Sequence, residues 1–217
     1  MNRLRKRYGL SRSQKLMVFI VSMSLYGLST MIAEVFPVMS IGPIVLSAKY
    51  FAFIPLILCM LFHPLYAAIG AAMGQFIFSG ILFGQIGGLS ELEQFVSLSI
   101  AMVVAGSIVK DPRNRKQIAV GAITGALIHH GIGSMADIQQ VLAGAADLEA
   151  LPGLAGIVII IEVFSFVNAI LISGLLFGLL PALYLVPRLT GRIEPLLGMQ
   201  PRRDAITFYR NNMLGPR

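Results

Sequence analysis

Long apolar runs separated by short charged segments constrain this chain more than any other feature. Of its 217 residues, 56% are hydrophobic and only 12% are charged. A soluble domain of this length could not bury so much apolar surface. The sequence therefore predicts an all-α integral membrane protein.

Six apolar runs have the composition of membrane helices. We expect helices over residues 16–36, 50–62, 64–84, 95–109, 117–135 and 154–186. The second run is short for a hydrocarbon core of ~30 Å. Residues 37–49, which contain Pro43 and alternating apolar positions, predict a short strand or a re-entrant segment, and residues 85–94 and 136–153 predict outer loops.

The basic residues predict the orientation of these six spans. Sixteen of the seventeen Lys and Arg residues fall in residues 1–15, 110–116 or 187–217, and Lys49 is the exception. Since basic segments beside spans stay in the cytoplasm, we expect both termini there. The predicted organisation is a basic N-terminal segment (1–15), a six-helix domain (16–186) in a prokaryotic plasma membrane, and a basic tail (187–217). Because these basic segments lie next to predicted membrane spans, we expect them to face the membrane surface and predict no nucleic-acid partner.

Polar side chains inside the apolar runs mark the candidate site, because each costs free energy unless it meets protein, water or a ligand. His129 shares a helix face with Gly121 and Gly125 and is expected to pack between helices, whereas His130 is freer to reach a cavity. For every such residue, pairing with a neighbouring helix is the alternative reading. The predicted substrate-binding residues are Lys49, Tyr50, Gln75, Gln85, His130, Glu162, Phe166 and Asn168, with Glu91, Asp137, Gln139 and Gln140 at the rim.

The order of the segments carries a resemblance to a known family. A basic N-terminus and a first span precede an outer Ile41-Gly-Pro-Ile-Val-Leu-Ser segment, a short second span, a His63-Pro-Leu turn and a third span rich in Gly and Ala. From about Lys15 to Pro187 this order resembles the substrate-binding S component of an energy-coupling factor (ECF) vitamin transporter. Among these proteins it is most similar to the cobalamin-specific type.

The resemblance implies a function and partners. It implies a six-helix subunit that captures a vitamin outside the cell and delivers it inward by reorienting in the membrane. A transmembrane scaffold subunit and two cytoplasmic ATPases would drive that motion, and the chain would hold no cofactor of its own. Cobalamin is the expected ligand, and another vitamin or a queuosine precursor is the alternative.

The same family docks its scaffold through small residues on the first helix. Here Ser22, Tyr26, Ser29 and Ala33 recur at helical spacing, although only Ser29 and Ala33 form a strict small pair. These four are the predicted partner-docking residues. Ordinary packing inside the bundle is the alternative for the same face.

Enzymatic functions find less support in the sequence, and we predict no catalytic residues. Ser134, close to His129 and His130, makes an intramembrane serine protease one alternative. All three residues lie on one short segment, however, whereas a nucleophile and its base usually meet from different elements. A haem held by His63 and His129 or His130 is a second alternative, but the predicted topology separates them. The single cysteine, Cys59, excludes an internal disulfide and a thiolate metal cluster.

Overall fold

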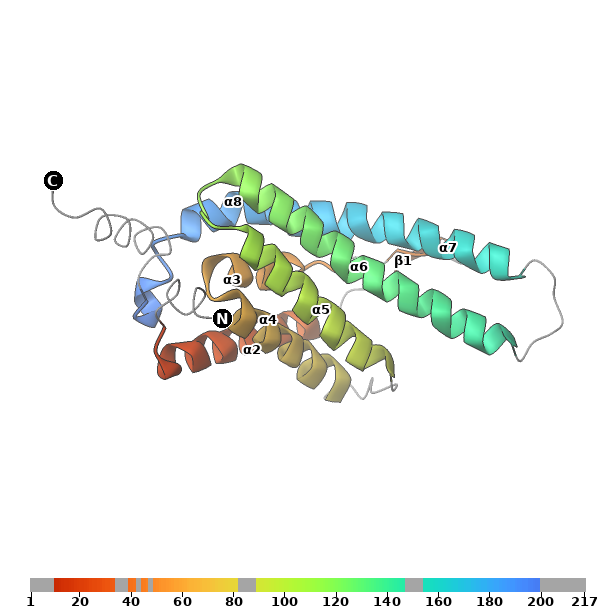
Figure 1. Ribbon diagram of the computed structural model, residues 1–217, viewed down its shortest axis with the longest axis horizontal. Coiled ribbons are helices and arrows are strands. Elements are labelled where there is room, and N and C mark those ends of the chain that lie inside the picture. The colour runs from red at the N-terminus through yellow and green to blue at the C-terminus, as the bar shows by residue number, and fades with distance from the viewer. Residues whose placement is uncertain are drawn as a thin grey trace.

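The computed structural model describes residues 10–33, 39–41, 44–46, 49–81, 89–146 and 154–199, and these residues are almost entirely helical (Figure 1). The helices are α2 (Arg12–Ala33), α3 (Phe53–Leu61), α4 (Pro64–Gln75), α5 (Leu89–Ile108), α6 (Arg115–Ala146), α7 (Leu154–Ala169) and α8 (Leu180–Leu189). Two π-helical stretches, η1 (Phe76–Ile81) and η2 (Ile170–Leu179), extend α4 and join α7 to α8, and a short 3₁₀ turn, η3 (Pro195–Leu197), follows.

Four helical stretches are long and apolar enough to cross a membrane. They are residues 12–33, 91–108, 115–139 and 159–189. α3 has only 9 residues, and the apolar helix over residues 64–78 is also shorter than a full span. Helices thus occur in all six predicted runs, while the count of six spans stays a prediction.

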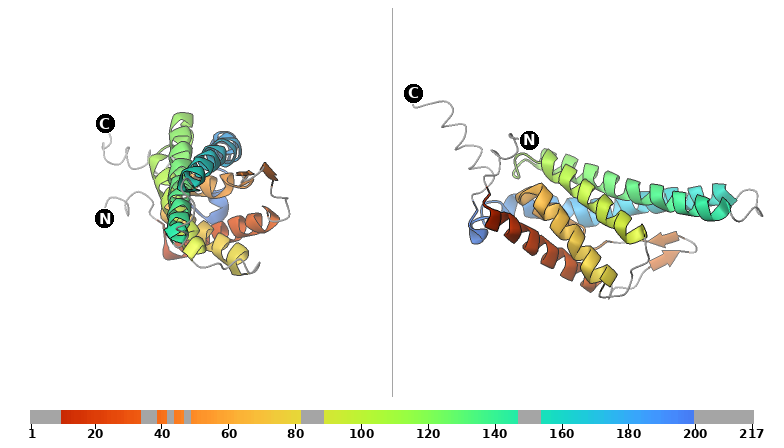
Figure 2. Two further views of the ribbon diagram at one scale, coloured as in Figure 1. Left: turned by 90° about the vertical axis from the view of Figure 1, so that its right-hand side faces the viewer. Right: turned by 60° about the horizontal axis from the view of Figure 1, so that its bottom comes forward.

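The segment between α2 and α3 contains the short strands that its alternating residues predicted. β1 (Met39–Ile41) pairs antiparallel with β2 (Ile44–Leu46), and Ser40 lies opposite Val45. Figure 2 shows this hairpin near the end of the bundle where α5 begins.

Two predicted outer loops are largely helical, which corrects the boundaries expected from the sequence. α5 begins at Leu89 rather than near Phe95, and α6 continues through Ala146 rather than ending near Met135. Asp137 and Gln139 therefore lie on a helix, not in a loop. Residues 136–146 contain Ala, Gln, Leu and Ile but no proline, so their intrinsic helix propensity outweighs their polarity.

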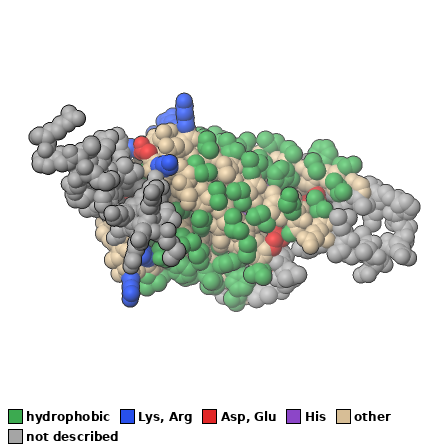
Figure 3. All heavy atoms as spheres, in the orientation of Figure 1, with side chains coloured by type: hydrophobic (Ala, Val, Ile, Leu, Met, Phe, Trp, Pro, Cys, Tyr) green, Lys and Arg blue, Asp and Glu red, His purple; other side chains and the backbone are tan. Residues whose placement is uncertain are grey.

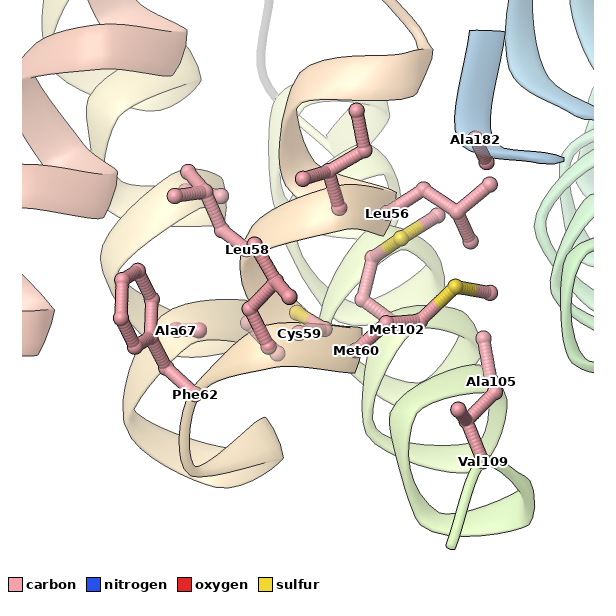
Figure 4. Packing of buried hydrophobic residues seen from close by; sticks show 14 of the residues in the cluster. Leu56, Leu58, Cys59, Met60, Phe62, Ala67, Met102, Ala105, Val109 and Ala182 are labelled. Carbon is pink, nitrogen blue, oxygen red and sulfur yellow. The ribbon is translucent and has the colours of Figure 1, made fainter. Parts of the chain in front are cut away.

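The core forms around α3, which is buried on every side. Leu56, Cys59 and Met60 are each at most 3% exposed. A helix that is apolar all round requires such surroundings, because no face of it could meet water or a polar partner. Figure 4 shows these side chains among residues of α4, α5 and α8.

Glycines bring the other helices into close contact. Gly70 and Gly74 of α4 lie against the backbone of α2 at Phe19 and Met23, and Gly121 of α6 lies against Ala105 of α5. A side chain at these positions would hold the helices apart, so these glycines make close helix crossings possible.

The predicted docking face of α2 is part of this internal packing. Ser22 is fully buried, Tyr26 is 4% exposed and Ser29 is 5% exposed, and the Ser29 hydroxyl donates to the Tyr26 carbonyl at 2.6 Å. Ala33, at the end of α2, is partly exposed. In this structure the face therefore packs inside the bundle, which is the alternative stated for it, and docking of a partner there stays a prediction.

The outer surface has two kinds of region. Large apolar side chains, including Ile20, Ile100, Leu127 and Phe164, are exposed along the length of the helices, as the green surface of Figure 3 shows. Lys and Arg side chains gather at the end of the bundle near the termini, where α5 meets α6. A helical bundle with an apolar belt and one basic end matches a membrane environment.

The α2–α4 crossing gives a direct test of the packing. We expect Gly74→Ala to destabilise the fold by about 1–3 kcal/mol, because the added methyl group meets the Met23 backbone rather than a mobile side chain. Gly156→Ala is the matched control, since no atom lies within 4 Å of a methyl group there. Thermal midpoints in detergent measure both, and equal midpoints would contradict the packing described.

Candidate solute-binding site

A polar cavity of about 270 Å³ lies between the start of α5, the second half of α6 and α7, with Lys49 reaching into it from the segment before α3. Charged and hydrogen-bonding side chains dominate its walls. The residues that line it are Lys49, Glu93, Gln94, Ser97, His129, His130, Gly133, Ser134, Asp137, Glu162, Ser165, Phe166 and Ala169.

A chain of hydrogen bonds fixes the inner wall of this cavity. The Lys49 Nζ lies 2.9 Å from Nε2 of His129, and Nδ1 of His129 lies 3.1 Å from the Ser97 hydroxyl, which donates to the Gln94 carbonyl at 3.2 Å. An ammonium group only donates, so Nε2 must accept and Nδ1 carries the proton that His129 donates to Ser97. His129 is therefore a neutral imidazole of one tautomer whenever Lys49 is charged.

The main chain holds Lys49 in place at both sides. Its backbone N–H donates to the Ser173 hydroxyl of η2 at 2.9 Å, and its carbonyl accepts from the Ala52 N–H at 3.1 Å, in the turn that leads into α3. π-helical stretches often occur at functional sites, and η2 supplies this contact.

Burial affects the charge of Lys49. Desolvation by the surrounding protein lowers the Lys49 pKa from 10.5 to about 8, while the Glu93 carboxylate partly opposes that effect. Lys49 is thus predominantly charged at neutral pH but loses its proton under mildly basic conditions.

Three carboxylates face the same cavity. Glu93 comes from α5, Asp137 from α6 and Glu162 from α7. Gly133 lies beside the first, since a Cβ there would be in van der Waals contact with a Glu93 carboxylate oxygen, 3.5 Å away. Among the described residues, none of the three pairs with Lys49 within ion-pair distance, and Lys49 has His129 as its side-chain partner.

A second, apolar cavity of about 30 Å³ adjoins the first and is large enough for a water molecule. Its walls include Tyr26 and Leu56. Lys49, His129 and His130 line both cavities, so these three side chains form the partition between a polar chamber and the apolar core.

The structure brings together half of the predicted binding residues. Lys49, His130, Glu162 and Phe166 line the polar cavity. His129 packs between helices, as expected, but its partner is Lys49.

The other predicted binding residues lie elsewhere. Tyr50 packs edge-on against Phe177, with the ring centres 5.1 Å apart. The Gln75 amide donates to Gln94 at 2.6 Å, one residue behind the cavity wall, and Asn168 does not line the cavity. Gln85 lies outside the described residues.

Sequence reasoning missed Glu93 and Ser97. Glu93 was expected in an outer loop, although a helix continued over residues 89–94 would have placed it on the same face as Ser97. For Ser97 alone no sequence signal existed, since a serine in an apolar helix usually bonds its own backbone.

The haem alternative would need His63 beside His129 or His130. His63 packs edge-on against Tyr66 with the ring centres 4.9 Å apart and lines neither of the two cavities that His129 and His130 line. Over the described ranges, no three His, Cys, Asp or Glu side chains gather as a metal site.

Comparison with known proteins identifies a family but no activity. Residues 17–215 match the profile of a family of unknown function (DUF8171). No curated protein and no solved structure matches the chain.

The Lys49–His129 contact predicts a measurable coupling. His129→Leu should destabilise the protein by about 1–3 kcal/mol, because it leaves a buried ammonium without its acceptor. Lys49→Met combined with His129→Leu should recover part of that loss, since both polar groups are then removed. Thermal midpoints of the two single variants and the double variant measure the coupling, and additive losses would contradict a direct contact.

The lowered pKa of Lys49 predicts a pH dependence of stability. Between pH 8 and pH 10.5 the unfolded chain holds the Lys49 proton more often than the folded protein, so the stability contribution of Lys49 rises with pH across this window. The thermal midpoint of the wild type relative to Lys49→Met should therefore increase from pH 7.5 to pH 10. Lys116→Met, at the basic end, controls for the loss of one positive charge. A midpoint difference between the wild type and Lys49→Met that stays constant or falls with pH would refute the lowered pKa of Lys49.

Proposed function

Because the chain belongs to this family of unknown function, we propose its function from the site: it is a membrane-embedded solute-binding subunit of a transporter. The observation that carries the proposal is the polar cavity of about 270 Å³ inside an otherwise apolar bundle. Buried charges are costly in such surroundings and generally mark substrate or ion pathways. The resemblance to ECF S components supports the same function.

The proposed topology has six membrane helices and both termini in the cytoplasm. The basic residues support this arrangement, because those of the described region other than Lys49 gather near the termini and the α5–α6 turn (Figure 3). Glu93, Asp137 and Glu162 lie toward the opposite end of their helices. In this proposal the cavity opens toward the outside of the cell.

The size of the cavity favours a small solute. Pockets for drug-sized ligands measure about 300–1,000 Å³, and about 270 Å³ lies just below that range. A corrinoid is larger than a drug-sized molecule, so a cobalamin ligand would require α6 and α7 to separate. We therefore propose a compact, polar vitamin-like solute in place of cobalamin.

The partners in this proposal supply the energy. The sequence has no glycine-rich phosphate loop, so a scaffold subunit and two ATPases would power uptake. Since Ser22, Tyr26 and Ser29 are buried, the scaffold would contact another face, and the exposed side chains Ile20, Leu28 and Ile32 of α2 offer one.

Native mass spectrometry of the protein purified from its own membrane tests the proposal. We expect the chain with a bound small organic molecule, and complexes that contain a second membrane subunit and two ATPases. Glu162→Gln combined with Asp137→Asn should reduce the ligand-bound fraction, and Gly156→Ala should leave it unchanged. A chain that never carries a solute or ATPase partners would exclude the function.

A further inference from the structure

The charges of the polar cavity run from a basic inner end to an acidic outer end, with Glu93 between them, since its carboxylate lies beside Gly133, midway between His129 and Asp137 on α6. Lys49, His129 and His130 also line the apolar cavity, so they mark the inner end. Asp137 follows His130 by seven residues on α6, which corresponds to about 10 Å along a helix.

The neighbouring helix contributes the second carboxylate of the outer end. α6 and α7 run in opposite directions beside each other (Figures 1 and 2). Glu162 of α7 lines the cavity with Asp137 and lies close enough to interact with it electrostatically, so the two belong to the same end.

We propose that the solute is a zwitterion, with its acidic group at Lys49 and its amino group at Asp137 and Glu162. This inference rests on the proposed function and adds the charge pattern of the ligand. The Lys49 ammonium has three N–H donors, and among the described residues its side-chain acceptor is His129, which leaves donors for a carboxylate or phosphate. At the outer end, two carboxylates from different helices match an ammonium group.

Ligands of a single charge fit this cavity less well. A cation near the inner end would meet Lys49 in a medium of low dielectric constant, where repulsion between like charges is strong. An anion at the outer end would meet Asp137 and Glu162. No three side chains of the described region form a metal site, so a bare metal ion does not replace the organic cation.

A matched set of six-carbon probes tests the charge pattern. The purified full-length chain in detergent is titrated with 6-aminohexanoate, hexylamine or hexanoate at pH 7, with heat of binding and thermal midpoint as readouts. We expect 6-aminohexanoate to bind at least ten-fold more tightly than either singly charged probe and to raise the midpoint.

Two variants assign the ends of the probe. Lys49→Met should weaken the binding of 6-aminohexanoate at least ten-fold and make hexylamine the preferred probe, because the inner positive charge is removed. Asp137→Asn combined with Glu162→Gln should shift the preference to hexanoate. Lys116→Met, at the basic end and outside the cavity, should bind as the wild type does.

The outcomes separate this inference from the function on which it rests. Hexylamine or hexanoate binding the wild type as tightly as 6-aminohexanoate would overturn the zwitterion, and so would the absence of binding by all three probes. The comparison of the three probes on the wild type needs no variant, so its result stands even if Lys49→Met misfolds. Co-purification of a solute and ATPases decides the transport function independently of this result.

Discussion

The site depends on one buried ammonium group and the imidazole that accepts from it. Lys49 carries a charge into an apolar bundle, and such a charge is tolerated only with hydrogen-bonding partners. His129 of α6 supplies one, Ser97 of α5 orients His129, and Ser173 of η2 holds the Lys49 backbone. A single residue from a connecting segment, through its side chain and its backbone, thereby links α5, α6 and η2 at the inner wall of the cavity.

Much of the fold could be predicted from the sequence because an apolar segment in a bilayer must satisfy its backbone hydrogen bonds within itself, which favours a helix. Apolar runs located the helices, and alternating residues located the hairpin. The errors share one cause: Glu93 and Asp137 are polar and were read as loop residues. A helix that lines a polar cavity carries such residues on its inner face, so local polarity cannot distinguish a loop from a cavity wall.

The candidate site was predictable only in part, for a related reason. The desolvation cost identified Lys49, His130 and Glu162 as residues that need a partner, but it does not say which partner. The Gln75 amide nitrogen finds a partner in Gln94 without reaching the cavity. The difference lies in the rotation of each helix about its axis, which is set by contacts such as Gly74 against Met23 and not by the polar residue itself.

The charges that make the cavity suitable for a ligand also weaken the bundle around it. Asp137 of α6 and Glu162 of α7 line the same cavity, and Figure 1 shows these two helices extending together beyond α5. Repulsion between two carboxylates favours separation of the helices, whereas an ammonium group between them favours closure. A ligand that binds the closed form stabilises it by mass action. Binding of a solute with an ammonium group would therefore be coupled to the packing of α6 against α7.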